Sequence, residues 1–226
     1  MSQIVTFVRD DFGFIIADTN IVDKDEKKLS LPQKKVFKGK RFIIATAGVG
    51  YGLYIIAGLM NSDKNMEFAE ASDVVNFLTN YGNQQYQKFL ENYKNKLNTN
   101  YLRLYFSIVG FRNKKLKHAV VGQEGFENLR ELNATNILTF PRRLGIELNL
   151  KKHYLDDGKE LIDTSLKSLE RIAKLDNFVS APFYYEIITC DLASWQTEKY
   201  MLYLHSKNKL ITGGFFMIRD SKLGLL

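Results

Sequence analysis

Cysteine, histidine and long apolar runs are scarce in this chain of 226 residues. Its single cysteine, Cys190, excludes an internal disulfide framework, and in its apolar surroundings we expect a buried thiol in a reducing compartment. The three histidines lie far apart in the sequence, without acidic residues at zinc-ligand spacing, so no metal site is expected. No apolar stretch reaches the ~20 residues of a membrane-spanning helix, and no signal peptide is recognisable. We therefore expect a cytoplasmic protein that does not contact a membrane.

The motifs of nucleotide-binding proteins are missing as well. Neither the phosphate-binding pattern G-x-x-x-x-G-K-[ST] nor the dinucleotide pattern G-x-G-x-x-G occurs. The string Gly48-Val49-Gly50-Tyr51-Gly52 lacks the lysine of a phosphate-binding loop, and a close-packed turn from a strand into a helix explains it. We therefore expect no cofactor. Because there is no internal repeat and no low-complexity linker, we expect one domain over residues 1–226.

Positive charge is in excess but is spread along the chain. There are 32 Lys and Arg against 25 Asp and Glu, which gives a formal net charge of +7. Most of the basic residues fall in expected turns, no helix carries a continuous basic stripe, and no helix-turn-helix or RNA-binding signature is present. A basic nucleic-acid-binding domain is therefore a lesser alternative, and the same charge would also attract an acidic partner.

Strand and helix signals alternate along most of the chain. Strand-forming residues bounded by turn residues predict strands, and apolar residues at three- and four-residue steps predict amphipathic helices. The expected strands are residues 4–9, 14–18, 35–37, 41–47, 102–111, 117–122, 183–190, 199–204 and 215–219. The expected helices are 52–61, 70–96, with Gly82 in its middle, and 157–174. This order favours an α+β fold in which two sheets pack together with helices outside.

Residues near the beginning of the chain have the types that an N-terminal nucleophile needs. A serine hydroxyl is a weak nucleophile, but the free α-amino group of the same residue, with a reference pKa of roughly 7.7 to 8.0, can act as its base. Ser2 acquires such an amine if Met1 is removed. A buried lysine would favour the alkoxide and lower the pKa of the amine by like-charge repulsion, and an aspartate would orient that lysine. Lys35 and Asp18 suit these two roles.

Two further residues belong to this hypothesis. Lys34 competes with Lys35, because successive side chains of a strand point to opposite faces and only one of the two can turn inward. Gly48 ends an expected strand, and its backbone N–H is a candidate donor to an oxyanion.

Three segments in this order resemble a known family. SQIVTFVRDDFGFIIADTN, KKVF and FIIATAGVGYG are similar to the beginning of the proteasome β-type family of N-terminal-nucleophile hydrolases, which includes bacterial proteasome-like ring peptidases. The resemblance implies a four-layer αββα sandwich of two mainly antiparallel sheets. It places the nucleophile on Ser2, the acid on Asp18, the lysine on Lys35 and the oxyanion glycine on Gly48.

A later stretch, SLKSLERIAKLDNFVSAPFYYEIIT, is similar to the helix, loop and strand in which the same family supports its nucleophile. The resemblance implies that Asp176 and Ser180 have this supporting role. Here the two residues are four apart, whereas the family spacing is three. The family's glycine-serine-glycine segment has no counterpart, since the corresponding region reads TNILTFPRRLG.

These residues predict peptide-bond hydrolysis through an acyl-enzyme on Ser2. The resemblance further implies peptide or unfolded-protein substrates, a ring or other homo-oligomer, and an unfoldase as a candidate partner. A second hypothesis stays open, in which the chain keeps the fold as a non-catalytic structural or scaffold subunit. A free Ser2 amine favours the enzyme, and a retained Met1 favours the scaffold.

Overall fold

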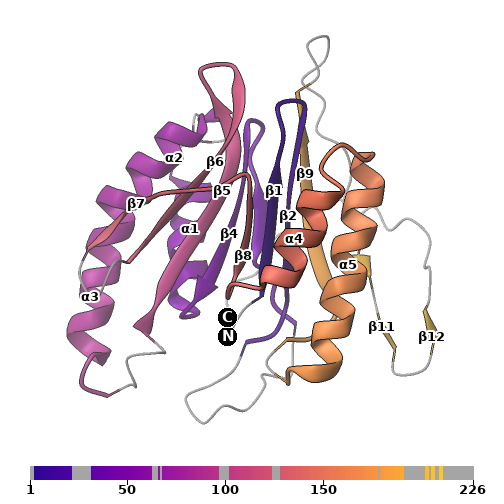
Figure 1. Ribbon diagram of the computed structural model, residues 1–226. Helices are drawn as coiled ribbons and strands as arrows, with labels where there is room; N and C mark the ends of the chain where they lie inside the picture. The colour runs from indigo at the N-terminus through magenta and orange to yellow at the C-terminus, as the bar shows by residue number, and fades with distance from the viewer. Residues whose placement is uncertain are drawn as a thin grey trace.

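Two antiparallel sheets form the centre of the computed structural model (Figure 1). The structure describes residues 3–21, 32–62, 66, 68–96, 102–123, 128–177 and 179–190, together with the short strand segments 202–203, 205–206 and 209–210. The first sheet has the strand order β10-β9-β2-β1-β8, and the second has the order β3-β4-β5-β6-β7. A separate pair is formed by β11 (His205–Ser206) and β12 (Lys209–Leu210).

The strands of each sheet are contributed by both halves of the chain. In spatial order, the first sheet contains β10 (Leu202–Tyr203), β9 (Phe183–Thr189), β2 (Phe12–Asp18), β1 (Ile4–Val8) and β8 (Ile137–Phe140). The second sheet contains β3 (Val36–Lys38), β4 (Phe42–Gly48), β5 (Leu104–Arg112), β6 (Lys115–Gln123) and β7 (Leu129–Leu132).

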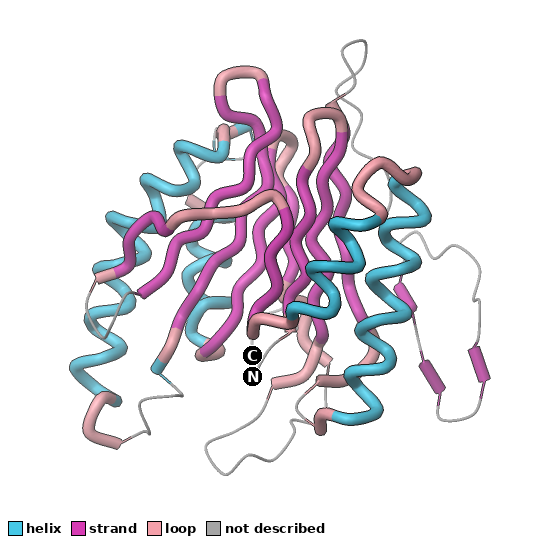
Figure 2. Tube along the Cα trace, in the orientation of Figure 1, coloured by secondary structure: helices cyan, strands magenta, loops and turns pink. Residues whose placement is uncertain are grey.

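Helices cover the outer face of each sheet, as the tube in Figure 2 shows. The second sheet is covered by α1 (Tyr51–Asn61), α2 (Ala71–Phe77) and α3 (Asn83–Tyr93), with a π-helical turn at Leu78–Gly82 between α2 and α3. The first sheet is covered by α4 (Leu144–Lys152) and α5 (Gly158–Leu175).

Three separate clusters of buried apolar side chains show that the molecule has four layers. One lies between α1–α3 and the second sheet, one lies between the two sheets, and one lies between the first sheet and α4–α5. Strand β2 supplies two of them in alternation, because Phe14 and Ile16 belong to the cluster with α4–α5 while Ile15 and Ala17 belong to the cluster between the sheets. The predicted α+β class and αββα layering are therefore confirmed.

Most of the elements expected from the sequence are present, with four differences. The helix expected over residues 70–96 is interrupted by the π-helical turn at Leu78–Gly82. Strands β7 and β8 and helix α4 were not predicted. The two strands are only four residues long. In α4, Leu144 and Leu148 are exposed, so the apolar residues of this helix do not all lie on one face. The sequence therefore lacks the pattern of an amphipathic helix there. The strand expected at 199–204 is described only at residues 202–203, and the one expected at 215–219 lies outside the described residues.

The connection from β4 to α1 depends on a glycine. Gly48 has a φ of +98°, and a Cβ atom built on it would lie 2.0 Å from the carbonyl oxygen of Arg103. The next residue, Val49, donates its N–H to that same oxygen over 2.7 Å. Gly50, by contrast, has a φ of −58° and open space where a Cβ would lie. The chain therefore requires glycine at Gly48 but not at Gly50.

We expect Gly48→Ala to lower the free energy of unfolding by about 1 to 3 kcal/mol, because the left-handed backbone is strained for alanine. The contact with Arg103 places the loss toward the upper end of that range. Chemical denaturation measures it, with Gly50→Ala as the matched control, for which we expect a change below about 0.5 kcal/mol. Equal losses in the two variants would contradict this account of the turn.

A chain of polar side chains joins the two sheets in their buried interface. Thr6 Oγ1 on β1 lies 2.7 Å from Ser107 Oγ on β5, which lies 2.9 Å from His118 Nε2 on β6. His118 Nδ1 lies 2.6 Å from the carbonyl oxygen of Thr135. A carbonyl oxygen only accepts, so Nδ1 carries a proton. Burial favours the neutral imidazole, and in that form Nε2 accepts from Ser107 while Ser107 accepts from Thr6.

Burial lowers the pKa of His118 to about 4, from an ordinary value of 6.5. Between these values the unfolded chain binds a proton that the folded protein does not, so the folded state loses stability as pH falls through this window. We expect the free energy of unfolding to fall by on the order of 2 to 3 kcal/mol from pH 7 to pH 4 through this group. Denaturation of wild type and His118→Gln across that range isolates the contribution, and parallel pH profiles would refute it.

Candidate functional site

The described candidate residues of the sequence analysis lie at one end of each sheet. In the first sheet, Ile4 at the start of β1 is paired with Ala17 and with Phe140, and Asp18 at the end of β2 is paired with Phe183. In the second sheet, the N–H of Thr46 donates to the carbonyl oxygen of Lys35 over 3.3 Å, so Lys35 lies beside the last residues of β4.

Asp18 and Lys35 form a buried ion pair that connects the two sheets. Lys35 Nζ lies 2.9 Å from Asp18 Oδ1, and the two side chains are 2% and 0% exposed. Lys35 Nζ also donates to the carbonyl oxygen of Asn20 over 2.5 Å. The Asp18 carboxylate accepts two further hydrogen bonds, from the backbone N–H of Gln3 over 2.9 Å and from that of Asn20 over 3.3 Å.

Burial and hydrogen bonding act in opposite directions on this pair. Burial raises the pKa of Asp18, while Lys35 and the N–H groups of Gln3 and Asn20 oppose the rise. Burial likewise lowers the pKa of Lys35, and Asp18 opposes that fall. Since the carboxylate is surrounded by three donors, its geometry stabilises the ionised form. The contact between Lys35 Nζ and Asp18 Oδ1 therefore has the geometry of an ion pair.

The structure distinguishes between the two neighbouring lysines. Lys34 Nζ contacts Glu186 Oε1 at 3.2 Å, and the Lys34 side chain remains 32% exposed. Lys35 turns inward to Asp18. The expectation that only one of the pair points inward is thus met by Lys35, in agreement with strand alternation.

Ser2 lies outside the described residues, whereas Gln3, the residue bonded to it, lies within them. Gln3 is completely buried, and its backbone N–H is held by Asp18 Oδ1, the same oxygen that accepts from Lys35. Its side-chain amide donates to the carbonyl oxygens of Phe140 and Pro141 over 3.1 and 3.2 Å. The chain at Gln3 is therefore fixed to the ion pair and to the turn that follows β8.

Asp176 and Ser180, the remaining expected residues, lie in the segment between α5 and β9. Asp176 follows the last residue of α5, and its Oδ2 accepts from Arg143 Nη2 over 2.5 Å. Ser180 is half-buried, and its side chain makes no hydrogen bond to the part of the chain that the structure describes. Because Asp18 pairs with Phe183, this segment approaches the same end of the first sheet as Asp18. Gly48 ends β4 at the corresponding end of the second sheet.

Sequence reasoning missed Gln3 and Arg143. Arg143 Nε donates to Gln3 Oε1 over 3.1 Å while its Nη2 contacts Asp176, so one guanidinium joins residues that are 140 and 33 positions away in the chain. Neither residue belongs to a recognisable motif. In the sequence, the one hint of Arg143 was the pair of arginines in Pro-Arg-Arg, in the region that lacks the expected glycine-serine-glycine segment.

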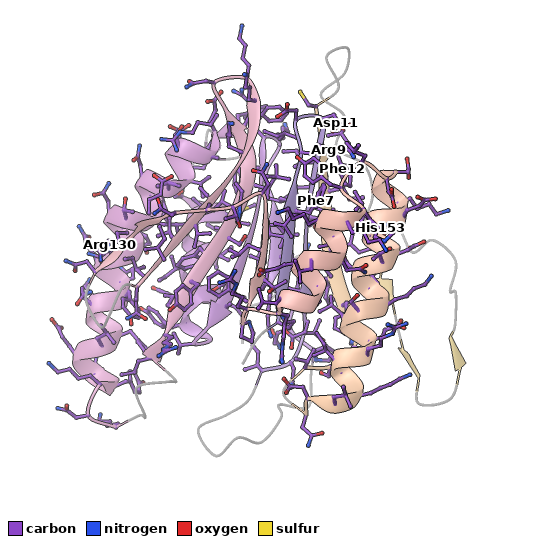
Figure 3. All side chains as sticks on the ribbon, in the orientation of Figure 1. Phe7, Arg9, Asp11, Phe12, Arg130 and His153 are labelled. Atoms are coloured by element: carbon purple, nitrogen blue, oxygen red, sulfur yellow. The ribbon has the colours of Figure 1, made fainter. Side chains whose placement is uncertain are left out.

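A cavity of about 360 Å³ lies elsewhere and does not belong to this site. It is lined by residues that include Arg9, Phe12 and Asp157, at the opposite end of β2 from Asp18. In Figure 3, Arg9, Asp11 and Phe12 lie together at that end of the first sheet. The guanidinium of Arg9 is fully engaged there, by Asp11 and by the carbonyl oxygens of Tyr154 and Asp156.

The described residues contain neither a candidate metal site nor a candidate membrane-spanning helix. Within these residues, no cluster of three or more His, Cys, Asp or Glu side chains is arranged to hold a metal ion. None of the described helices combines the length and apolar character needed to cross a membrane.

The layers and the strand order define a four-layer αββα fold of the α+β class, and comparison with solved structures supports this fold. The fold is similar to Anbu (ancestral beta-subunit) from Yersinia bercovieri, with a TM-score of 0.64 and 12% identity over 89% of this chain and 86% of that one. It is also similar to a Gly-1 mutant of Anbu from Hyphomicrobium sp. strain MC1, with a TM-score of 0.61 and 11% identity over 89% of this chain and 87% of that one. No protein-family model matches the chain, and no curated protein matches its sequence.

These comparisons correct the family expected from the sequence. The resemblance pointed to the proteasome β-type family, whereas the similar structures are Anbu proteins, a related but different branch. The physical reason is that the motifs behind the resemblance lie on β1–β4 and on the turn into α1. These elements build the layers of the fold, so their order indicates the fold and does not separate one branch from another.

We expect Lys35→Met to lower the free energy of unfolding by about 3 to 5 kcal/mol, because it leaves Asp18 buried without its cation. Asp18→Asn removes the opposite charge, and the double variant should recover part of the loss since neither charge remains. Chemical denaturation of the four proteins measures the coupling, with Lys117→Met at an exposed position of β6 as the control. Strictly additive losses would contradict the ion pair.

Proposed function

We propose that the protein hydrolyses peptide bonds with Ser2 as an N-terminal nucleophile, exposed after removal of Met1. The observation that carries the proposal is the shared oxygen Asp18 Oδ1, which holds both the ammonium of Lys35 and the backbone N–H of Gln3. The residue bonded to Gln3 is Ser2, so the proposed nucleophile is attached directly to the group that the ion pair fixes. Perturbed, buried ionisable pairs of this kind are frequent at functional sites.

In this mechanism the α-amino group of Ser2 takes the hydroxyl proton as Ser2 Oγ attacks the substrate carbonyl. The carbon–nitrogen bond then breaks, the amine returns the proton to the leaving group, and an ester on Ser2 remains. Water hydrolyses that ester by the same proton transfers in the second half of the reaction. The backbone N–H of Gly48 stabilises the oxyanion in both halves.

Lys35 assists by its positive charge and by one ammonium N–H group that has no acceptor among the described residues. Within the described part of the chain it donates to Asp18 and to Asn20, which uses two of its three ammonium N–H groups. We assign the third to Ser2 Oγ, where the positive charge favours the alkoxide. Asp18 keeps the ammonium charged and oriented. Asp176 and Ser180 support the α-amino group from the segment between α5 and β9.

The proposal includes a homo-oligomeric, proteasome-like assembly in the cytoplasm, built from one domain per chain and acting on peptides or unfolded proteins. Its support is the similarity of the fold to Anbu proteins, whose name stands for an ancestral beta-subunit. An unfoldase is a partner that such an assembly would suit.

Intact-protein mass spectrometry before and after treatment with a β-lactone tests the nucleophile. We expect loss of Met1 and one adduct per chain, both in wild type, and no adduct in Ser2→Ala. Lys35→Met should slow labelling by at least about 100-fold, because it removes the electrostatic assistance to the alkoxide. Lys34→Met is the matched control, since Lys34 contacts Glu186 and not Asp18, and it should stay within about threefold of wild type.

Circular dichroism of each variant separates loss of labelling from loss of folding. If Lys35→Met does not fold, Lys35→Arg keeps the charge but places it differently, and it should still lower the labelling rate. A folded wild-type protein that retains Met1 and takes up no adduct would reject the enzyme and leave the non-catalytic scaffold subunit as the function.

A further inference from the structure

Gln3 is held by contacts with two segments that are far apart in the chain, the end of β2 and the stretch from Phe140 to Arg143. Its backbone N–H binds Asp18 at the end of β2, and its side-chain N–H₂ binds the carbonyl oxygens of Phe140 and Pro141 after β8. Its side-chain oxygen accepts from Arg143 Nε over 3.1 Å, immediately before α4. Chain ends generally fray unless they are tied down, and Gln3 is instead completely buried.

Arg143 extends this set of contacts to a third segment. Its Nη2 lies 2.5 Å from Asp176 Oδ2, where α5 ends. A guanidinium can do this because its nitrogen atoms point in fixed, different directions, so Nε reaches Gln3 while Nη2 reaches Asp176. A lysine has a single nitrogen and cannot make both contacts in this geometry.

The backbone of Arg143 is itself held in place. Its N–H donates to Thr139 Oγ1 over 2.6 Å, and Thr139 donates its hydroxyl and its N–H to Glu147 Oε1 over 2.9 and 3.1 Å. Thr139 is 1% exposed, so this local network is rigidly packed. The guanidinium of Arg143 therefore starts from a fixed position at the beginning of α4.

We propose that Arg143 is a positioning residue that fixes the N-terminal segment beside the Asp18–Lys35 pair by bridging Gln3 to Asp176. This inference rests on the proposed function, because it assigns to the bridge the task of holding the residue before Gln3 in a reactive geometry. Displacement of a reacting group by about 1 Å can lower a rate by about 100-fold. The bridge acts through Gln3 and Asp176, and Arg143 takes no part in the chemistry.

Kinetics of β-lactone labelling test the bridge through the maximal rate and the half-saturating concentration. We expect Arg143→Gln and Arg143→Lys each to lower the maximal labelling rate by about 10- to 100-fold and to leave the half-saturating concentration within about threefold. The lysine variant separates geometry from charge. If Arg143→Lys labels at the wild-type rate, the proposal that Arg143 must contact both Gln3 and Asp176 is wrong.

Arg142 supplies the matched control at the neighbouring position. Its side chain is 73% exposed and contacts Glu147 Oε2 at 3.4 Å, without reaching Gln3 or Asp176. Arg142→Lys and Arg142→Gln should label at the wild-type rate. Equal losses for Arg142 and Arg143 variants would indicate a general effect of surface charge and overturn the proposal.

A second measurement does not depend on enzymatic activity. Amide hydrogen exchange of Gln3, followed by nuclear magnetic resonance, reports whether its N–H stays bound to Asp18. We expect Arg143→Lys to raise the exchange rate of this amide by at least about tenfold and Arg142→Lys to leave it unchanged. An unchanged rate in Arg143→Lys would overturn the bridge. If wild type takes up no lactone, the proposed function fails, and this measurement still decides whether Arg143 fixes Gln3.

If Arg143→Gln does not fold, Asp176→Asn tests the other end of the bridge. Asparagine keeps the size of the side chain and an acceptor oxygen but removes the charge, so the contact with Arg143 weakens while the packing remains. We expect faster exchange of the Gln3 amide in this variant too. Wild-type exchange there would show that Asp176 does not stabilise the bridge, which would reject the proposal.

Discussion

The buried contact between Asp18 and Lys35 is the interaction on which the rest of this site depends. Removing two charges from water costs several kcal/mol for each ion, and the cost is offset only if the surrounding groups supply hydrogen bonds in good geometry. Here they come from Gln3, from Asn20 and from the two charged side chains themselves. The need to satisfy both charges therefore fixes the start of β1, the end of β2 and the approach to β3 relative to one another.

The same constraint reaches the second half of the chain. Gln3 is buried where its N–H donates to Asp18, and a buried side-chain amide needs hydrogen-bond partners. It finds them in the turn after β8 and in Arg143, which in turn binds Asp176. Segments separated by more than 130 residues thus meet at one end of the first sheet. This connectivity distinguishes the end of the sheet from the cavity near Phe12, whose lining includes none of these residues.

Much of the architecture could be predicted from the sequence, because it follows from local patterns. Alternation on β2 sends Phe14 and Ile16 to one side and Ile15 and Ala17 to the other, and a protein with such strands and amphipathic helices such as α5 must form layers. Short elements such as β7 and β8 escaped prediction, since four residues give too little periodicity. The sequence motifs also did not predict the branch of the fold, because the motifs that form the layers are common to more than one branch.

By itself, the sequence determined the layers, the glycine at Gly48 and the presence of one acid and one lysine at suitable places in the chain. Each of these depends on periodicity or on the conformation of single residues, which act locally. Only the tertiary structure decided that Lys35 and not Lys34 reaches Asp18, and that Gln3, Arg143 and Asp176 form one hydrogen-bonded bridge. These contacts depend on the register between strands and on the burial of polar groups, and both arise only when distant segments pack together.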